Sequence, residues 1–283
     1  MNEPFAGRRL EKRLEKDFDF AKLITLIDEE YQKDNREVKR KRKETFRPSS
    51  IGYGSGNCPR RHYISFSGAE FDESNNTLSI ITMKNGEDTH TRLQAKFTNA
   101  GVMKEEEREL RVEDPPIRGF IDAVVELDGI EAVVEFKTAR QESFVHRELN
   151  DTPQPYHLYQ LLVYMYFEGI DQGLLWYENK NDNRTYVIPV KMNDFTREIV
   201  EDCIEWMRMV RANWELDATF KDVPEGAEPG DEQYWPEVSY EHLPTRSFTK
   251  KSIACKSCPV FKECWEILEE GSVEIPAMEV VSL

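Results

Sequence analysis

Two short apolar runs, residues 119–127 and 130–137, each carry an acidic residue, and an Asp-Gly dipeptide separates them. Asp-Gly between two strand-like runs is a strong signal for a tight hairpin turn. Antiparallel pairing from a two-residue turn sets Asp122 directly opposite Glu135. Carboxylates in that arrangement repel each other unless a cation lies between them, and oxygen ligands suit Mg²⁺ or Mn²⁺. The sequence therefore predicts a divalent-metal site on one face of this hairpin.

A cation-bearing side chain follows on the same strand. Lys137 lies two residues beyond Glu135, and side chains two apart in a strand share a face. An ammonium group there can orient an attacking water or offset charge that develops on a phosphate. The same three residues are also compatible with ordinary charges on the solvent face of a sheet. The hairpin alone leaves both interpretations open.

Hydrophobic periodicity predicts the elements that would position these groups. We expect a strand over residues 106–113 and a second hairpin that joins residues 173–178 to 184–190. We expect helices over the ranges 78–97, 156–167 and 194–216, with Cys203 as a core thiol inside the last of these. Residues 8–47 are charged and are expected to be helical, and residues 218–247 form a long excursion rich in Pro, Gly and acids.

The order of these motifs resembles the RecB-type branch of the PD-(D/E)XK nuclease superfamily. The matching motifs are G-x-x-x-H at Gly86 and His90, G-F-I-D ending at Asp122, V-V-E-F-K with Glu135 and Lys137, and Q-x-x-x-Y at Gln160 and Tyr164. The resemblance implies that His90, Asp122 and Glu135 bind the metal, that Lys137 positions or activates the water, and that Gln160 and Tyr164 hold the substrate strand. It implies an α/β, restriction-endonuclease-like core, in which a mixed central sheet is flanked by helices.

The cysteine pattern is a second resemblance. Cys255, Cys258 and Cys264 are clustered and Cys58 lies far upstream, and clustered cysteines in an intracellular protein favour metal over disulfides. This layout is similar to the iron–sulfur nucleases of the superfamily, including AddB-type and CRISPR-associated RecB-like nucleases. It implies a [4Fe–4S] cluster that ties the N- and C-terminal segments of the domain together, with structural Zn²⁺ as the alternative for four thiolates.

These resemblances imply three parts: a charged helical segment over residues 1–48, a nuclease domain with an iron–sulfur lobe over 49–270, and an exposed acidic tail over 271–283. The expected activity is Mg²⁺- or Mn²⁺-dependent hydrolysis of DNA, as an exonuclease on single-stranded ends, in recombination, replication or repair, including phage or CRISPR-related pathways. The alternative is a non-catalytic iron–sulfur or zinc module that binds DNA or protein. A redox protein would leave the grouping of Asp122, Glu135 and Lys137 without a role.

Charge and composition limit the remaining classes. The net charge of −16 argues against a general binder of polyanions, but the run over residues 36–47 is strongly basic. That run is either a solvated surface or the place where phosphate groups bind. The sequence has no membrane-spanning run, no signal-peptide core and no phosphate-binding loop of an ATP-driven motor. We therefore expect a cytoplasmic protein.

Overall fold

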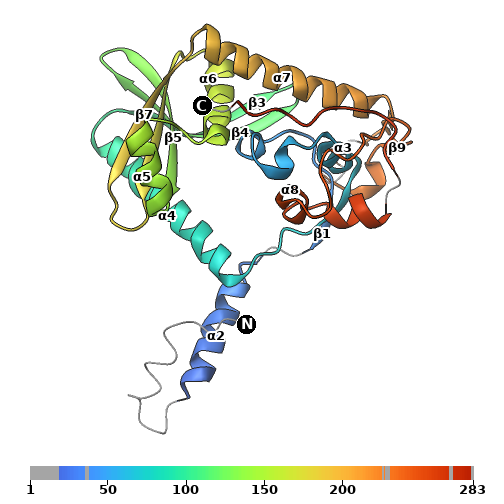
Figure 1. The fold of residues 1–283 in the computed structure, drawn as a ribbon, viewed down its shortest axis with the longest axis horizontal. Helices are drawn as coiled ribbons and strands as arrows, with labels where there is room; N and C mark the ends of the chain where they lie inside the picture. The colour runs from blue at the N-terminus through green and yellow to red at the C-terminus, as the bar shows by residue number, and fades with distance from the viewer. Residues whose placement is uncertain (1–18, 36–37, 225, 227–229, 268–269, 282–283) are drawn as a thin grey trace.

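A five-stranded mixed sheet forms the centre of the computed structural model, which describes residues 19–35, 38–224, 226, 230–267 and 270–281 (Figure 1). Its strands, in spatial order, are β3 (Met103–Val112), β4 (Ile117–Leu127), β5 (Ile130–Ala139), β6 (Gln172–Asn179) and β7 (Thr185–Lys191). Neighbouring strands are antiparallel except β5 and β6, which are parallel. Parallel neighbours need a crossover, and α5 (Gln141–Asn150) and α6 (Pro155–Glu168) supply it.

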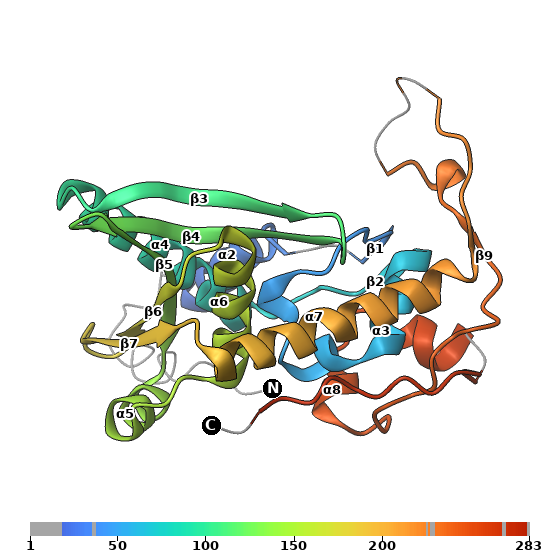
Figure 2. The same cartoon turned by 90° about the horizontal axis from the view of Figure 1, so that it is seen from above.

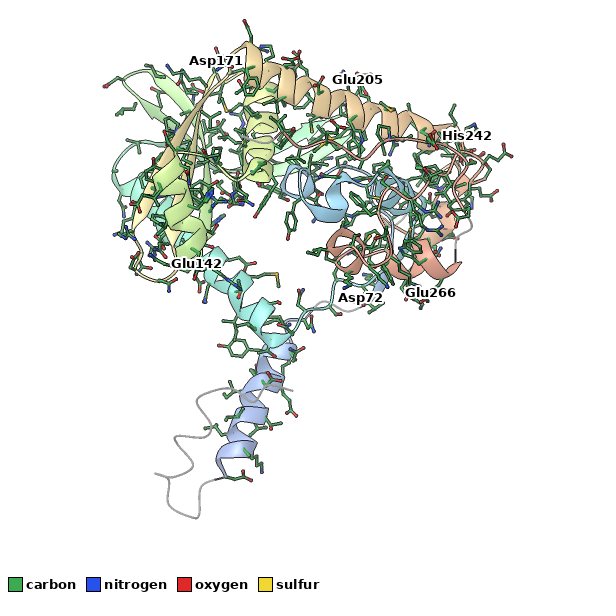
Figure 3. All side chains as sticks on the ribbon, in the orientation of Figure 1. Asp72, Glu142, Asp171, Glu205, His242 and Glu266 are labelled. Atoms are coloured by element: carbon green, nitrogen blue, oxygen red, sulfur yellow. The ribbon has the colours of Figure 1, made fainter. Side chains whose placement is uncertain are left out.

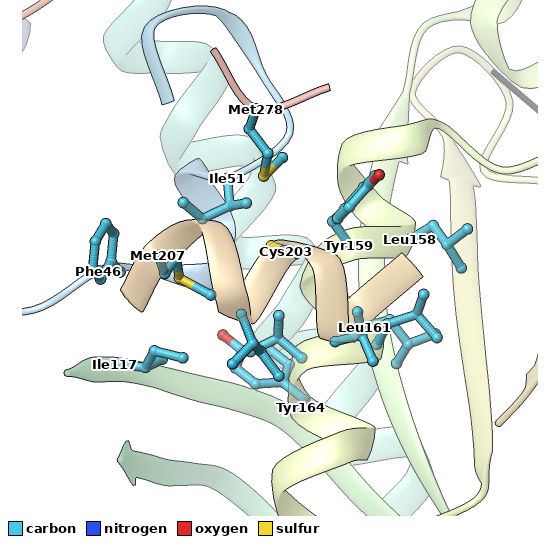
Figure 4. Close-up of a cluster of buried hydrophobic side chains, with 14 of the residues drawn as sticks. Phe46, Ile51, Ile117, Leu158, Tyr159, Leu161, Tyr164, Cys203, Met207 and Met278 are labelled. Carbon is cyan, nitrogen blue, oxygen red and sulfur yellow. The ribbon is translucent and has the colours of Figure 1, made fainter. Parts of the chain in front are cut away.

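Helices cover both faces of the sheet. On one face α4 (Thr77–Asn99) packs Leu93 and Phe97 against Val134 and Phe136 of β5. On the other face α6 lies between the sheet and α7 (Asp194–Glu215), and apolar side chains from all three layers form the main core (Figure 4). Because α6 is enclosed on several sides, eight consecutive residues of it, 158–165, are buried. The predicted mixed sheet flanked by helices is therefore confirmed.

The periodic segments fold as predicted. The helices expected over 78–97, 156–167 and 194–216 correspond to α4, α6 and α7, and the strand expected over 106–113 is β3. Both hairpins are present, as β4–β5 and β6–β7. Cys203 lies on the buried face of α7 between Tyr159 and Met207, as a core thiol (Figure 4).

A smaller layer lies beside the sheet and joins segments from both ends of the chain (Figure 2). Its elements are β1 (Lys39–Lys41), η1 (Pro48–Ser50), η2 (Gly54–Asn57), α3 (Pro59–Ser67), β2 (Ala69–Phe71), α8 (Ile253–Lys256) and the π-helical turn η4 (Glu263–Ile267). The N–H of Asp72 donates to the carbonyl of Pro259 at 2.8 Å, and Lys262 pairs with Glu70. Residues from before the sheet and from near the C-terminus therefore pack together.

The excursion after α7 is tied back to this layer. It contains β8 (Ala218–Thr219), η3 (Glu232–Tyr234) and β9 (Glu237–Val238), with β8 and β9 antiparallel. Asp217 lies where the excursion begins, and its buried carboxylate accepts hydrogen bonds from Tyr63, Ser239 and His242. These bonds hold both ends of the excursion against α3.

The N-terminal prediction needs a correction. Within the described residues only α2 (Phe20–Gln32) is helical there, residues 8–18 lie outside them, and the basic run forms β1 and extended chain. The reason is Phe46, a residue that is only 1% exposed. Its N–H donates a hydrogen bond to the carbonyl of Pro116, and its carbonyl accepts one from the N–H of Arg118 at the start of β4. A helix through this segment could not place Phe46 in the core and pair β1 with β2 at the same time.

The C-terminal segment is also less exposed than predicted. Ile275 and Met278 are both 6% exposed, and the N–H of Met278 donates to Asn57 at 3.0 Å. Buried apolar residues are interspersed with exposed acids such as Glu274 and Glu279, so this segment covers the core with one face. None of the helices in the described ranges is long and apolar enough to cross a membrane.

Candidate active site

The predicted hairpin register is confirmed near the turn and ends just before Asp122 and Glu135. Asp128 and Gly129 have φ values of 53° and 78°, as a tight hairpin turn requires. The paired residues are Leu127 with Ile130, Glu126 with Glu131, Val125 with Ala132, Val124 with Val133, and Ala123 with Val134. The pairing stops there, so Asp122 and Glu135 are not the direct cross-strand partners that the register predicted.

The two strands separate at Asp122. Its Oδ2 atom accepts a hydrogen bond from the backbone N–H of Phe136 at 2.8 Å, in place of a bond between strands. Beyond this point β4 continues beside β3, and β5 continues beside β6. Asp122 and Glu135 therefore lie on either side of a fork in the sheet, 7% and 1% exposed.

Glu135 is held by two side chains on one of its oxygens only. Its Oε1 accepts from Lys137 Nζ at 2.5 Å and from Gln160 Nε2 at 2.6 Å, and Lys137 also donates to Gln160 Oε1 at 3.0 Å. Its Oε2 is buried and has no hydrogen-bond partner in the described part of the chain. A buried carboxylate oxygen left without a partner is costly, so a ligand for it is expected here.

The electrostatics of Glu135 are consistent with that expectation. Burial raises the pKa of its carboxyl group; Lys137 opposes the rise, and the neighbouring Asp122 carboxylate adds to it. Two carboxylates in a low-dielectric fork stay ionised together only if positive charge compensates them. A divalent cation beside Asp122 and Glu135 would provide that charge.

His90 reaches the fork from α4. Its Nδ1 lies 3.3 Å from Asp122 Oδ1, and Gln94, one turn later, donates to the backbone carbonyl of Asp122 at 2.9 Å. Burial lowers the pKa of His90, but the hydrogen bond to Asp122 and its negative charge outweigh burial, so the pKa is raised. The imidazole that the sequence predicted as a ligand is thus beside the carboxylates.

Gln160 and Tyr164 approach from α6 but lie inside the protein. They are 6% and 2% exposed, and the Tyr164 hydroxyl interacts with Gln160 and with the backbone of Phe120. A Cβ atom at Gly119 would lie 2.8 Å from that hydroxyl, so only glycine permits β4 to pass so close to α6. Gln160 contacts Glu135 and Lys137 directly, and Tyr164 contacts Gln160. Contact of either residue with a substrate strand stays a prediction.

Four elements thus bring all the predicted site residues of the hairpin and its neighbours together: α4, β4, β5 and α6. Two further residues at the fork, Gln94 and Gly119, were not predicted from the motifs. Gln94 lies four residues after His90 on one helix face, and Gly119 opens the G-F-I-D motif. Both residues therefore lie in or beside the motifs in the sequence, but their roles depend on contacts between distant segments.

The four clustered cysteines also meet. Cys58, at the start of α3, lines one small cavity with Cys255, Cys258 and Cys264, and all four thiols are free. Burial raises the pKa of Cys258 to about 12; the charge of Arg61 opposes the rise, and Cys58 and Cys264 add to it. The cavity holds about 20 Å³, which is close to the space of one water or one metal ion.

Neither site forms a complete ligand shell as it stands. Among the described residues, no group of three or more His, Cys, Asp or Glu side chains is arranged closely enough to hold a metal ion. At the fork the available donors nevertheless suit a divalent cation, because they are one imidazole nitrogen and two carboxylate groups, and Glu135 Oε2 lacks a partner. At the cysteines the four thiols suit zinc or an iron–sulfur cluster, although a four-iron cluster requires a larger cavity.

Comparisons with known proteins give only distant likenesses. No family model matches the chain, and no curated protein matches it. Among solved structures, an alkaline exonuclease (LHK-Exo) from Laribacter hongkongensis is 14% identical with a TM-score of 0.39, over 47% of this chain and 71% of that one. LHK-Exo in complex with dAMP is 14% identical with a TM-score of 0.41, over 51% of this chain and 73% of that one. The structure of SSO0001 is 18% identical with a TM-score of 0.37, over 69% of this chain and 84% of that one. These values identify no family, so the function is argued from the site.

Proposed function

We propose that the protein is a metal-dependent nuclease that hydrolyses phosphodiester bonds of DNA. The observation that carries the proposal is the buried fork, where Glu135 has one oxygen bonded to Lys137 and Gln160 and the other without a partner. Surface charges on a sheet, the alternative interpretation of these residues, would be exposed and solvated. The mixed sheet flanked by helices is consistent with the restriction-endonuclease-like fold that the motifs imply.

His90, Asp122 and Glu135 are the residues that would hold Mg²⁺ or Mn²⁺. A divalent ion there would polarise the phosphate and lower the pKa of a bound water. The imidazole favours Mn²⁺ more than a site with oxygen ligands alone would. Asp122 keeps its orientation through the backbone N–H of Phe136, and Gln94 fixes the strand that carries it.

Lys137 supplies the positive charge from the protein itself. Its ammonium group has three N–H donors, of which Glu135 and Gln160 take two. The third donor is left for a water or a phosphate oxygen, where it orients the nucleophile or offsets developing negative charge. Gln160 bridges Glu135 and Lys137, so it holds the donor and the carboxylate in a fixed relation.

We infer single-stranded DNA as the substrate from an aromatic pair near the site. Tyr53 is 58% exposed, and its ring lies 4.9 Å from that of Tyr156 at the start of α6. Tyr156 lies four residues before Gln160 on α6, so the two side chains share a helix face. Burial and the neighbouring Tyr53 raise the pKa of Tyr156, and the charges of Arg147 and Lys137 oppose the rise. Unpaired bases stack on exposed aromatic rings, whereas bases in a duplex are not accessible to them.

We propose a structural metal centre at the four cysteines. The spacing of three cysteines after a single distant one favours a [4Fe–4S] cluster, whereas the small cavity favours Zn²⁺. Either centre would bind α3 to the segment that carries α8, and would stabilise the layer beside the active site. The biological setting that we propose is recombination, replication or repair, including phage or CRISPR-related DNA processing.

Incubation of the protein with labelled single-stranded DNA tests the function. Loss of the substrate with Mn²⁺ or Mg²⁺, and its survival with EDTA, is the expected result. Release of mononucleotides would show an exonuclease, and accumulation of shorter fragments an endonuclease. The alternative is a non-catalytic DNA-binding module, for which the strand would be retained in a gel shift and would remain intact under both conditions.

A further inference from the structure

The basic run borders a second cavity, separate from the fork. The cavity holds about 160 Å³, and its lining includes Lys43, Arg47 and Arg61. The backbone N–H of Lys43 donates to the carbonyl of Ser65 at 2.8 Å, which fixes the run against α3. Three cationic side chains from two segments therefore face one small space.

Most of this positive charge is not neutralised by the protein. The guanidinium groups of Arg47 and Arg61 make no ion pair with any described residue, and Arg61 Nε is buried without a hydrogen-bond partner in the described part of the chain. Arg61 also lines the cysteine cavity, where the thiols of Cys58 and Cys258 lie near its charge, so Arg47 carries the charge that is least compensated. Glu73, the acidic residue of the lining, pairs with Lys41 at 2.6 Å and lies 4.0 Å from Lys43. Burial, together with the charges of Arg47 and Lys41, lowers the pKa of Lys43 to about 8, and Glu73 opposes the fall. An anion in the cavity would remove this repulsion.

Neutral donors complete the lining. The hydroxyl groups of Thr45 and Ser49 make no hydrogen bond within the part of the chain that the structure describes, although both residues line the cavity. A phosphate accepts hydrogen bonds from hydroxyl groups and takes two parallel bonds from a guanidinium group. The volume is below the 300 Å³ or so of a typical pocket for a larger ligand, so it suits one phosphate group rather than a nucleotide.

The cavity is connected to the active site through the η1 turn. Arg47 and Ser49 flank Pro48, and Pro48 Cδ lies close to Gly119 of β4. The loop then continues over α6 to Tyr53. A single strand that stacks on Tyr53 therefore has a short route along this loop to the cavity.

The positive charge around this cavity contrasts with the acidic character of the rest of the surface. Acidic side chains such as Glu142, Asp171, Glu205 and Glu266 project from separate elements around the molecule (Figure 3). A protein with a net charge of −16 repels DNA over most of its surface, so a local excess of positive charge determines where a strand can bind.

We propose that this cavity binds one phosphate group of the DNA strand, held by Lys43, Arg47 and Arg61, and so fixes the strand relative to the active site. The inference rests on the proposed nuclease function for its substrate. The shared chemistry is a phosphate group, which is either a terminal monoester or an internal diester. A terminal phosphate carries nearly twice the charge of a diester and would bind more strongly to three cations.

The test measures binding of labelled single-stranded DNA, without added divalent cations, to Arg47→Gln and Lys43→Gln. Each variant should bind about tenfold more weakly, because each loses one charge-assisted contact with phosphate. Lys39→Gln is the matched control: Lys39 belongs to the same run but does not line the cavity, and its variant should keep the affinity of the parent protein. Affinities of the two cavity variants equal to that of Lys39→Gln would overturn the proposal.

Strands with a 5′-phosphate, a 3′-phosphate or neither identify the source of the phosphate. A preference of the parent protein for one phosphorylated end, lost in Arg47→Gln, assigns the cavity to a terminal monoester. Equal binding of the three strands, all weakened alike in the variants, assigns it to an internal diester. Inorganic phosphate alone should raise the melting temperature of the parent protein and not that of Arg47→Gln. A cooperative melting transition of Arg47→Gln also shows that the variant is folded.

The two proposals can fail separately. Binding that depends on Arg47, in a protein that cuts no strand with Mn²⁺ or Mg²⁺, would remove the nuclease function and leave the phosphate site. Metal-dependent cleavage with unchanged binding and unchanged cleavage in Arg47→Gln would leave the function and remove the site.

Discussion

Gln160 connects α6 to Glu135 and Lys137 of the proposed active site. It donates to Glu135 and accepts from Lys137, so its loss frees both groups to rotate. We expect Gln160→Leu to lower kcat roughly 10- to 100-fold, the usual size of effects from residues that orient metal ligands. DNA affinity measured without metal should stay unchanged. Gln233→Leu, in an exposed 3₁₀ turn, is the control.

A result that separates positioning from direct substrate contact comes from the same variant. If Gln160 held the strand itself, Gln160→Leu would weaken DNA binding and raise KM. A fall in kcat alone supports the positioning role. Gln160→Glu should not restore activity, because it adds a negative charge beside Glu135. A variant that cleaves DNA at the rate of the parent protein would contradict the account of Gln160.

Gly119 is required by the close approach of β4 to α6. In Gly119→Ala the new Cβ would lie 2.8 Å from the Tyr164 hydroxyl and 3.1 Å from Pro48 Cδ. We expect a loss of about 1–3 kcal/mol in the free energy of unfolding, as for other overpacked sites. Urea unfolding measures the loss.

Gly86 provides the matched comparison, because a Cβ atom there would meet nothing within 4 Å and the residue lies inside α4. Gly86→Ala should raise the free energy of unfolding by about 1 kcal/mol, since alanine favours the helix. Equal effects of the two substitutions would show that the contact between Gly119 and Tyr164 is not tight.

Buried histidines make stability depend on pH. Burial lowers the pKa of His62 to about 3, and its Nε2–H donates to the Gly56 carbonyl at 2.8 Å. Between this value and the unfolded value of about 6.5, only the unfolded chain takes up the proton, so stability falls as the pH falls. His157, with a pKa lowered to about 2, adds in the same direction.

We therefore expect a slope of up to about 1.4 kcal/mol per pH unit from His62 across this window. Urea unfolding of the parent protein and of His62→Gln at several pH values measures it. The variant should be less stable at pH 7 but should show a shallower slope below pH 6. An unchanged slope would mean that His62 is protonated in the folded protein.

At the scale of elements, the glycine-rich loop and α6 together present the aromatic pair. Tyr53→Ala should weaken binding of single-stranded DNA by about 1–3 kcal/mol, the usual contribution of a base stacked on an aromatic ring. Binding of a blunt duplex should not change. Gel shifts with both substrates measure the difference. Equal weakening for the two substrates would argue against stacking of unpaired bases.

Local patterns predicted most of these elements, for physical reasons that the residues make clear. The Asp-Gly turn and the alternation beside it fixed five pairs of the β4–β5 register, and the apolar stripes fixed α4, α6 and α7. The elements depend on periodicity within one segment, which the sequence contains in full. The place of His90 was implied only by the family resemblance, which also assigned Gln160 to the substrate strand; the structure brings His90 to Asp122 and Gln160 to Glu135.

Three features depend on distant partners, and the sequence did not predict them. The register ends at Ala123 because Asp122 takes the N–H of Phe136, which no local pattern indicates. The basic run is extended because Phe46 fits beside Ile117, seventy-one positions later in the chain. Ile275 and Met278 are buried because the tail returns to Asn57.

At the scale of the whole molecule, Cys58 meets the segment that carries Cys255, Cys258 and Cys264, and the proposed metal centre would join the two. Cys58→Ser should lower the metal content of the purified protein and its melting temperature, because one of four thiol ligands is lost. Cys203→Ser is the control: this thiol is buried in the core away from the cavity, so the metal content should remain. Metal analysis and an absorption spectrum after anaerobic purification measure the effect.

The spectrum also identifies the centre. A brown protein with a broad shoulder in the blue contains an iron–sulfur cluster, and a colourless protein with bound zinc contains Zn²⁺. A folded protein without iron or zinc, whose melting temperature is unchanged in Cys58→Ser, would contradict the proposal of a metal centre.

The measurement that tests the central claim most directly is cleavage of single-stranded DNA with Mn²⁺ by Lys137→Ala, compared with Lys104→Ala. Lys104 also pairs with glutamates, but it lies on the exposed surface of β3. We predict that Lys137→Ala loses cleavage and keeps its fold, measured by circular dichroism, while Lys104→Ala cleaves normally. Undiminished cleavage by folded Lys137→Ala would contradict the assignment of the fork as the active site.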